Sequence, residues 1–483
     1  MNGIDTGGVP GFVVAGTRSS SGKTATAMAL LRALGDRGFV AAAGKAGPDY
    51  IDPAFHAAVT GRPAASLDLW MCAAEPGDDG IAGLRRIASR LARGADILVV
   101  EGAMGLYDGA HRGVGSTAQV ARALGLPVLL LLDAGGCGQS VAAMAEGFLR
   151  FRQEGGGEGP EFLGIVCTHV GGRRHVRLLA DALRHLEGEA PMLGALPREG
   201  APRLPSRHLG LVEARQVFPH LDQNRMKEWL ENGVDVDRLL DLLGLPPRRE
   251  TGPAVPVSSV ERNTGADLTV AIARDEAFSF CYGDLPTLLR ELGADVVFFS
   301  PLHDAAIPPC HGILLPGGYP EECAEALGGN ASMIAAMGEA AARGVPVYGE
   351  CGGYVYLMES LRYRGRDHPM AGLLPGRCVI GEERAALGYR SGTLLWRMVP
   401  GDGAPVRVRG HEFHYGRLEG SSMPSRGDPL WELEASDGED LGPDGCRIGT
   451  VAGSWLHLYP EGSRPFWRAW LAFAAMQRDG AAP

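Results

Sequence analysis

The chain has 483 residues, of which 71 are glycine and 33 are proline, while 45% are hydrophobic and 21% are charged. A disordered chain would contain far fewer apolar residues, so the glycines and prolines indicate a folded protein with many tight turns. The formal net charge of −11 argues against a protein that binds nucleic acid electrostatically, because such a protein would carry a basic stripe or tail.

The N-terminus and the apolar segments predict a cytoplasmic protein that does not bind membranes. Residues 1–11 lack the basic and apolar regions of a secretory signal. The longest apolar stretches, such as 127–132, are far shorter than the ~20 residues of a membrane span. The nine cysteines are an odd number without a CxxC pair, which disfavours a disulfide framework or a zinc knot.

Residues 11–200 repeat a pattern of strand, loop and helix. The short apolar runs are 12–16, 38–43, 95–100, 126–133, 162–167 and 192–196, and helix-like segments include 23–36, 117–125 and 141–151. Nearly continuous apolar strands separated by helices predict a parallel sheet that is covered on both faces.

A second α/β block begins at residue 268. Its apolar runs are 268–275, 294–301, 312–318 and 344–351, followed after residue 375 by glycine-punctuated segments of antiparallel character up to 454–460 and a closing helix at 466–477. Between the blocks, residues 246–266 are rich in Pro, Gly, Ser and charge, without a period. We therefore predict a domain at 1–245, a linker at 246–266 and a domain at 267–483.

The segment GTRSSSGKT, from Gly16 to Thr24, leaves a strand and enters a helix. Free N–H groups and the positive dipole end at a helix start hold phosphates. In such a loop Lys23 would reach the outer phosphates and Thr24 would bind Mg²⁺. Thr17 occupies the place of the usual first glycine, and Gly16 stands one place earlier. We predict an ATP site formed by Gly16, Thr17, Ser20, Ser21, Gly22, Lys23 and Thr24.

Carboxylates follow the second and third predicted strands. Asp49 and Asp52 come after the second, and Glu101 and Asp108 come after the third. The carboxyl ends of parallel strands form the edge at which such sheets bind ligands. Carboxylates beside a nucleotide suggest magnesium-assisted phosphoryl transfer, with Glu101 as a further Mg²⁺ ligand. Asp49 and Asp52 could instead cap a turn, and for Asp133, after the next strand, a helix cap is the favoured role.

A cysteine stands at a predicted strand-to-helix turn in GECGGY (349–354). Small residues around Cys351 are typical of a nucleophile elbow, and a helix N-terminus favours the thiolate. The glycine-rich loop at Gly317 and Gly318 could form an oxyanion hole, and His457 could act as the base.

His411 and His414 belong to a segment, HEFH, that invites a zinc interpretation. In an extended strand these two side chains face opposite sides, so we expect a structural or interdomain role rather than a metal site.

Taken together, the motifs resemble those of the cobyrinic acid a,c-diamide synthases, including the hydrogenobyrinic acid enzymes. With GKT (22–24) they are KxGPDYIDPxFH (45–56), SLDLWM (66–71), EGxMGLYDG (101–109), LPSRHLGLV (204–212), PGGYPE (316–321), GECGGY (349–354), LGYR (387–390) and GHEFHY (410–415). The resemblance implies an α/β protein with an N-terminal parallel-sheet P-loop NTPase domain, similar to dethiobiotin synthetase. It also implies a C-terminal α/β domain of the class I glutamine amidotransferase type.

The resemblance also implies a chemistry. Cys351 would attack the amide of L-glutamine and form a γ-glutamyl thioester, with His457 as base, and ammonia would be released. ATP would phosphorylate a carboxylate of the corrinoid, first at c and then at a, and ammonia would displace the phosphate.

The resemblance is compatible with a homodimer. The implied site residues carry over position by position. Gly317, Gly318 and Gly352 would surround the oxyanion and the glutamine; Thr24, Glu101 and Asp49 would bind Mg²⁺; Asp49, Tyr50, Ile51, Asp52 and Asp108 would surround the corrinoid acetate.

The chain departs from the family pattern at three places. Tyr459 stands where many amidotransferases have Glu, which resembles the cobyrinic and cobyric acid branch. Ser66 stands where Asn is usual, and Thr168-His169 replaces an Asn-Arg that helps to hold the nucleotide base.

Two alternatives stay open at this point. The substrate could be a sirohydrochlorin-type tetrapyrrole such as nickel-sirohydrochlorin. The chain could also be a P-loop switch ATPase of the partitioning type with a degenerate amidotransferase domain, although a binding module has no need of a thiol on an elbow.

Overall fold

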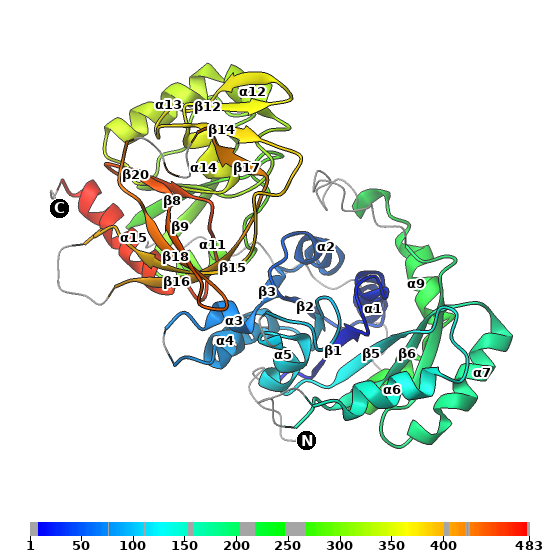
Figure 1. The fold of residues 1–483 in the computed structure, drawn as a ribbon. Helices are drawn as coiled ribbons and strands as arrows, with labels where there is room; N and C mark the ends of the chain where they lie inside the picture. Colours follow the sequence, from blue (N-terminus) through cyan, green and yellow to red (C-terminus); the bar gives the residue numbers. More distant parts are fainter. Residues whose placement is uncertain are drawn as a thin grey trace. The chain divides into compact units, whose positions relative to one another are not determined.

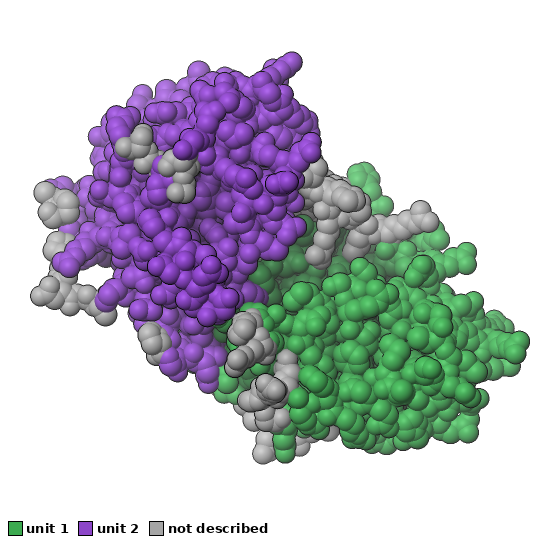
Figure 2. Space-filling view, viewed as in Figure 1, with its two compact units in different colours: residues 1–70, 81–258 green, residues 71–80, 259–483 purple. Residues whose placement is uncertain are grey.

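The computed structural model describes residues 8–75, 77–110, 113–152, 158–202, 218–246, 267–399, 405–420, 423 and 426–480. The chain divides into two compact units, residues 1–70 with 81–258 and residues 71–80 with 259–483 (Figure 2). The predicted linker, apart from Pro246, and the motif at 204–212 lie outside the described residues, so the boundary at 246–266 stays a prediction. Within the described part of the chain, no helix is long and apolar enough to cross a membrane.

The first unit is built on a seven-stranded sheet of order β3-β2-β4-β1-β5-β6-β7 (Figure 1). Its neighbouring strands are all parallel. The strands are β1 (Gly11–Gly16), β2 (Ala41–Ala46), β3 (Ala65–Leu67), β4 (Ile97–Glu101), β5 (Val128–Asp133), β6 (Phe162–Val170) and β7 (Met192–Pro197). The helices in this part of the chain are α1 (Lys23–Asp36), α2 (Ile51–Thr60), α3 (Leu69–Cys72), α4 (Ile81–Ala92), α5 (Thr117–Leu124), α6 (Val141–Arg150), α7 (Arg173–Leu183), α9 (Gln223–Glu231) and α10 (Val236–Leu242).

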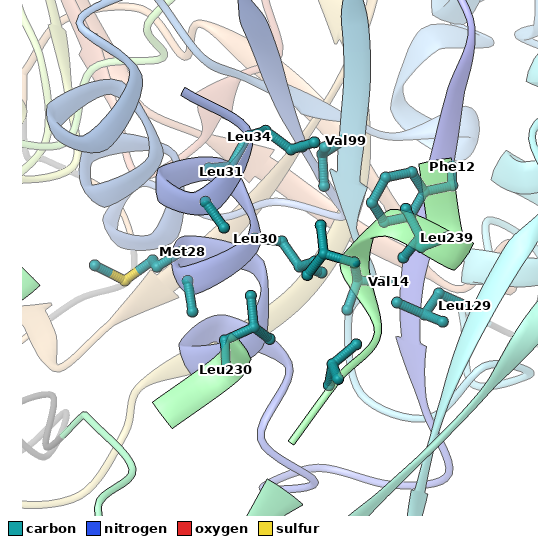
Figure 3. Close-up of a cluster of buried hydrophobic side chains, with 14 of the residues drawn as sticks. Phe12, Val14, Met28, Leu30, Leu31, Leu34, Val99, Leu129, Leu230 and Leu239 are labelled. Atoms are coloured by element: carbon teal, nitrogen blue, oxygen red, sulfur yellow. The ribbon is translucent and has the colours of Figure 1, made fainter. Parts of the chain in front are cut away.

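Apolar side chains from α1, α9 and α10 form the core on one face of this sheet (Figure 3). Leu30 of α1 packs in one cluster with Val14 and Val99 of the strands, and Leu230 and Leu239 complete it. Two further helices also contact the sheet, α5 at β1 and α6 at β5. The prediction of an apolar parallel sheet interleaved with helices is confirmed.

The second strand runs over Ala41–Ala46 instead of the predicted 38–43. Gly38 and Phe39 instead form the turn that follows α1, because their N–H groups donate to the carbonyls of Gly35 and Leu34 at 3.0 Å each. At its other end the strand continues through a buried lysine, Lys45, which a count of apolar residues would exclude. The predicted bounds were therefore three residues too early.

The second unit contains three sheets. One sheet has six strands in the order β20-β21-β11-β10-β8-β9. The second has four strands in the order β13-β12-β14-β17, and the third has five in the order β19-β18-β15-β16-β22. The strands are β8 (Leu268–Ala273), β9 (Ala294–Phe299), β10 (Gly312–Leu315), β11 (Val347–Glu350), β12 (Ser360–Tyr363), β13 (Arg366–Pro369), β14 (Arg377–Ile380), β15 (Ala386–Leu394), β16 (Arg407–His414), β17 (Gly416–Leu418), β18 (Trp431–Ala435), β19 (Asp440–Asp444), β20 (Cys446–Ile448), β21 (Val451–Ser454) and β22 (His457–Leu458). The helices are α11 (Leu285–Glu291), α12 (Ala324–Gly329), α13 (Ala331–Ala342), α14 (Gly352–Leu357) and α15 (Arg464–Arg478).

The expectation of antiparallel structure after residue 375 is confirmed for the five-stranded sheet, whose pairs are all antiparallel. It is wrong for β21, which pairs in parallel with β11 and is buried along its whole length. This pairing sets Ser454 opposite Glu350, so the segment that leads to His457 runs beside the end of β11.

Candidate active sites

The loop from Gly16 to Lys23 wraps closely around the start of α1. A Cβ atom on Gly16 would lie 1.9 Å from the Ser21 hydroxyl oxygen, so any other residue would require the Ser21 side chain to move. Gly22 has a φ of 91° and Ser20 a φ of 61°, in the left-handed region where a non-glycine residue is uncommon. The close approach of Ser21 explains why the glycine of this loop precedes Thr17.

The two predicted phosphate-site residues of α1 reach the loop that follows β4. Lys23 Nζ donates to the carbonyl oxygens of Arg18 at 3.0 Å and Met104 at 2.5 Å. Thr24 Oγ1 donates to Glu101 Oε1 at 2.7 Å. The structure therefore brings Thr24 and Glu101 together at the carboxyl edge of the sheet.

A buried charge network surrounds Glu101. Lys45 Nζ lies 2.8 Å from Glu101 Oε1 and 2.8 Å from Asp52 Oδ2, and His56 Nε2 lies 2.8 Å from Glu101 Oε2. Burial alone would lower the pKa of Lys45, but Glu101 and the neighbouring aspartates raise it well above its ordinary value. Burial alone would raise the pKa of Glu101, but Lys45 and His56 lower it far below the ordinary range. Both groups therefore stay charged at neutral pH.

Sequence reasoning missed the roles of Lys45 and His56, although both lie in the motif at 45–56. The available signal was a lysine at the end of an apolar strand, followed by carboxylates. Because a buried lysine needs an acidic partner, that position predicts a partner on the neighbouring strand, where Glu101 stands directly across the β2–β4 ladder.

The turn before α2 is organised by Asp49. Its Oδ1 accepts from the N–H groups of Ile51 at 2.8 Å and Asp52 at 3.0 Å, and the Ser66 hydroxyl donates to its carbonyl oxygen at 2.9 Å. Tyr50 is the N-cap residue of α2 and is half-buried. Asp49 thus caps the turn, and its role as a magnesium or substrate ligand stays a prediction.

Two further carboxylates stand in the loops at this edge. Asp108 is exposed, and its Oδ2 accepts from the Gly105 N–H at 2.8 Å. Asp133 pairs with Arg18 at 2.5 Å and with His169 Nδ1 at 2.9 Å. Burial opposes the ionisation of Asp133, but the hydrogen bond from His169 is among the contacts that give a net lowering of its pKa. Asp133 therefore ties the phosphate loop to the end of β6 instead of capping a helix.

The oxygen donors of Thr24 and Glu101 suit a magnesium ion that takes its other ligands from phosphates and water, as Mg²⁺ usually does. Within the described ranges, no group of three or more His, Cys, Asp or Glu side chains could hold a metal by itself. The chain alone thus offers a partial coordination sphere that a nucleotide would complete.

In the second unit, Cys351 occupies a sharp turn between β11 and α14. Its φ is 46°, in the left-handed region, and its N–H donates to the Ser454 carbonyl at 2.8 Å. A Cβ atom on Gly353 would lie 2.0 Å from the Leu315 carbonyl oxygen, so the residue that follows the turn has to be small. The strained backbone and the small neighbours are those of a nucleophile elbow.

The loop after β10 lies against both the elbow and His457. A Cβ atom on Gly352 would stand 2.9 Å from the Gly318 nitrogen, and one on Gly317 would stand 2.2 Å from His457 Cε1. The Leu458 N–H donates to Glu350 Oε1 at 3.3 Å, which ties the residue after His457 to the residue before Cys351. The structure thus gathers the predicted nucleophile, oxyanion loop and base around one point.

Burial keeps the side chains of Cys351 and His457 uncharged in the protein alone. Burial and the nearby Glu321 raise the pKa of the Cys351 thiol well above its ordinary value. Burial, His411 and His414 lower the pKa of His457 well below its ordinary value. The Gly352 N–H does favour the thiolate, as expected for a helix N-terminus, but burial and Glu321 outweigh it and the net shift of the thiol pKa is upward.

The two histidines of HEFH have different neighbours, as expected for alternating faces of a strand. The His411 ring stacks on the His457 ring, with centroids 5.0 Å apart and an interplanar angle of 14°. The His414 ring stacks on Trp455, with centroids 4.3 Å apart.

Comparisons with known proteins identify the two units. Residues 12–212 match the CobQ/CobB/MinD/ParA nucleotide binding domain, and residues 269–465 match the CobB/CobQ-like glutamine amidotransferase domain. A hydrogenobyrinate a,c-diamide synthase of Brucella suis is 41% identical over 93% of this chain and 98% of its own length. A cobyrinate a,c-diamide synthase of Gloeobacter violaceus is 39% identical over 93% of each chain. The chain belongs to the a,c-diamide synthase family.

Membership of the a,c-diamide synthase family makes the chain a glutamine-dependent, ATP-using ligase. Among solved structures, PurLQS from Thermotoga maritima matches 43% of this chain and 98% of its own, with a TM-score of 0.31 and 15% identity.

We expect the buried carboxyl of Glu350 to make folding stability depend on pH. Burial raises its pKa from 4.5 to about 8, so the folded protein holds a proton there that the unfolded chain releases at lower pH. The stabilisation is complete below the unfolded pKa and is lost as pH rises toward the folded pKa. Glu350→Gln should therefore lose less Tm than wild type between about pH 5 and pH 8. The exposed Glu432→Gln is the control, and an unchanged pH slope in Glu350→Gln would contradict the neutral carboxyl.

Proposed function

We propose that the chain amidates the a- and c-acetate carboxylates of cobyrinic or hydrogenobyrinic acid in cobalamin biosynthesis. The observation that carries the proposal is the presence, in one chain, of a phosphate loop joined to a buried carboxylate and of a cysteine elbow and a buried histidine that both adjoin one glycine loop. Relatives that carry the names of these synthases match 93% of this chain.

In the amidotransferase unit, the proposed nucleophile is Cys351 and the proposed base is His457. Both groups are neutral in the protein alone, so the thiol proton moves to His457 as sulfur attacks the glutamine amide carbon. The Gly318 N–H lies beside the elbow, where it can stabilise the oxyanion. The thioester forms as the C–N bond breaks and ammonia leaves with a proton from His457, and water then releases glutamate.

In the synthetase unit, the proposed phosphate ligands are Lys23 and the N–H groups at the start of α1. Thr24 and Glu101 would hold Mg²⁺, which neutralises phosphate charge when it is bound. A corrinoid carboxylate attacks the γ-phosphorus of ATP, ADP leaves, and ammonia then displaces phosphate from the acyl phosphate. Asp49, Tyr50, Ile51, Asp52 and Asp108 are the residues that we propose around the acetate, while their capping contacts give the turn its shape.

A sirohydrochlorin-type tetrapyrrole is the second candidate substrate. Purified enzyme with ATP, Mg²⁺ and glutamine should form ADP and a diamide with cobyrinic acid or hydrogenobyrinic acid. Mass spectrometry would show the mass change of two carboxylates converted to amides. Turnover with nickel-sirohydrochlorin alone would overturn the corrinoid assignment.

We expect Cys351→Ser to abolish glutamine-dependent amidation and glutaminase activity. Ammonium supplied in solution should restore ATP-dependent amidation, because the synthetase chemistry needs ammonia and not the thiol. A Cys446→Ser variant, which changes another buried cysteine, is the matched control and should keep glutaminase activity. Equal glutaminase rates in Cys351→Ser and wild type would contradict the proposed nucleophile.

We expect Glu101→Gln to lower ammonium-dependent synthetase turnover by at least on the order of 10²-fold, because a charge that stabilises the reacting phosphates is lost. Asp49→Asn should act in the same direction. Glutaminase activity, measured in the same preparations, should persist and report that the amidotransferase unit is folded, while circular dichroism reports folding of the whole chain. Glu231→Gln, which removes a carboxylate that pairs with Arg37 near the surface, serves as the control. Loss of stability with turnover intact would reduce either residue to a structural role.

A further inference from the structure

We propose that His411 positions the His457 ring for its reaction with Cys351. The inference rests on the proposed function, in which His457 is the base, and it assigns a role to a residue that the motif at 410–415 left as structural. His411 touches neither glutamine nor the reacting sulfur in this proposal. It acts through His457 and is therefore a positioning residue.

The two rings are held against each other by both backbone and side chains. His411 and His457 are directly opposite in the antiparallel pair of β16 and β22, and both side chains are buried. Their rings are nearly parallel, at 14°, with centroids 5.0 Å apart. A Cβ atom on Gly410 would lie 2.0 Å from the His457 carbonyl oxygen, so the two strands can approach this closely only with glycine beside His411.

The His411 ring is itself fixed by a tyrosine. Tyr282 Oη lies 3.1 Å from His411 Nδ1, within hydrogen-bond distance. When this hydroxyl donates to Nδ1, a neutral His411 carries its proton on Nε2. The Tyr282 ring packs edge to face against Tyr459, with centroids 5.3 Å apart. Tyr459, which stands where many amidotransferases have Glu, thus belongs to the packing that orients His411.

These contacts restrict the His457 ring from two directions. His411 covers one side of the ring, and Gly317 comes so close to Cε1 that a Cβ atom there would be 2.2 Å away. A ring held in this way keeps its nitrogens at fixed positions beside the elbow. Because small displacements of a reacting group reduce rates steeply, the stack contributes to the rate by orientation.

We expect His411→Ala to lower kcat for glutamine hydrolysis on the order of 10²-fold, with little change in the KM for glutamine. His411→Phe keeps a ring against His457 and should retain most of the rate. Tyr282→Phe keeps the ring but removes the hydrogen bond to His411, and its rate should fall between those of the other two variants. His414→Ala is the matched control for the plateau rate alone, because this β16 histidine stacks on Trp455 instead of His457. It is not a control for the pH profile, because His414 also lowers the pKa of His457.

The pH profile gives a readout that a merely structural role would not move. The titratable groups around His457 are Cys351 and Glu350 at the elbow, His411 and His414 on β16, and Tyr282 and Tyr459 beside them. His411 lowers the pKa of His457, so its removal should raise that pKa. The acid limb of kcat/KM for glutamine should therefore move to higher pH in both His411→Ala and His411→Phe, although only the alanine variant loses the plateau rate.

The outcomes separate this inference from the proposed function. Ammonium-dependent amidation, measured on the same full-length variants, reports folding of the synthetase unit, and circular dichroism reports folding of the whole chain. A folded His411→Ala with the glutaminase rate and acid limb of wild type overturns the positioning role. Equal losses in His411→Phe and His411→Ala overturn orientation by the stacked ring. If His457→Asn keeps glutaminase activity, the proposed base itself is wrong.

Discussion

The ion pairs of Lys45 are the interaction on which the synthetase site depends. Glu101 and Asp52 are both buried, and two carboxylates cannot both stay ionised in such a place without a cation between them. With Lys45 in place, Glu101 keeps its charge beside Thr24. Removing one partner of a buried pair costs about 3–5 kcal/mol, so the same contacts that prepare the phosphate edge also hold β2 and β4 in register.

The candidate site of the amidotransferase unit differs from the synthetase site because its reacting groups are buried in their neutral forms. Its elbow and its histidine are buried without a charge of their own, and burial also keeps Glu350 protonated at neutral pH, with a pKa of about 8. The positions of Cys351 and His457 are therefore set by close packing contacts instead of ion pairs. Gly317, Gly352 and Gly353 admit backbone or ring atoms where a side chain would collide, so the local geometry of the site requires glycine at these positions.

Sequence patterns predict the strands, the phosphate loop and the elbow because each depends on local order: an apolar run, a glycine pair, a small residue beside a nucleophile. They do not predict what depends on partners far along the chain. The pairing of Lys45 with Glu101 and the stack of His411 on His457 join residues from different strands. The protonation of Cys351 is a further example, because the helix N-terminus that favours its thiolate is visible in the sequence whereas the burial that outweighs it is not.

A neutral thiol at the elbow has a consequence for reactivity. The nucleophile is the thiolate, and a thiol with a raised pKa is inert toward oxidants and other electrophiles. In the proposed mechanism, proton transfer from Cys351 to His457 accompanies the attack on a bound glutamine. The negative charge then passes to the amide oxygen, which can accept a hydrogen bond from the Gly318 N–H. Reactivity in this unit therefore arises with substrate, and accurate placement of the His457 ring matters more than a permanently charged pair.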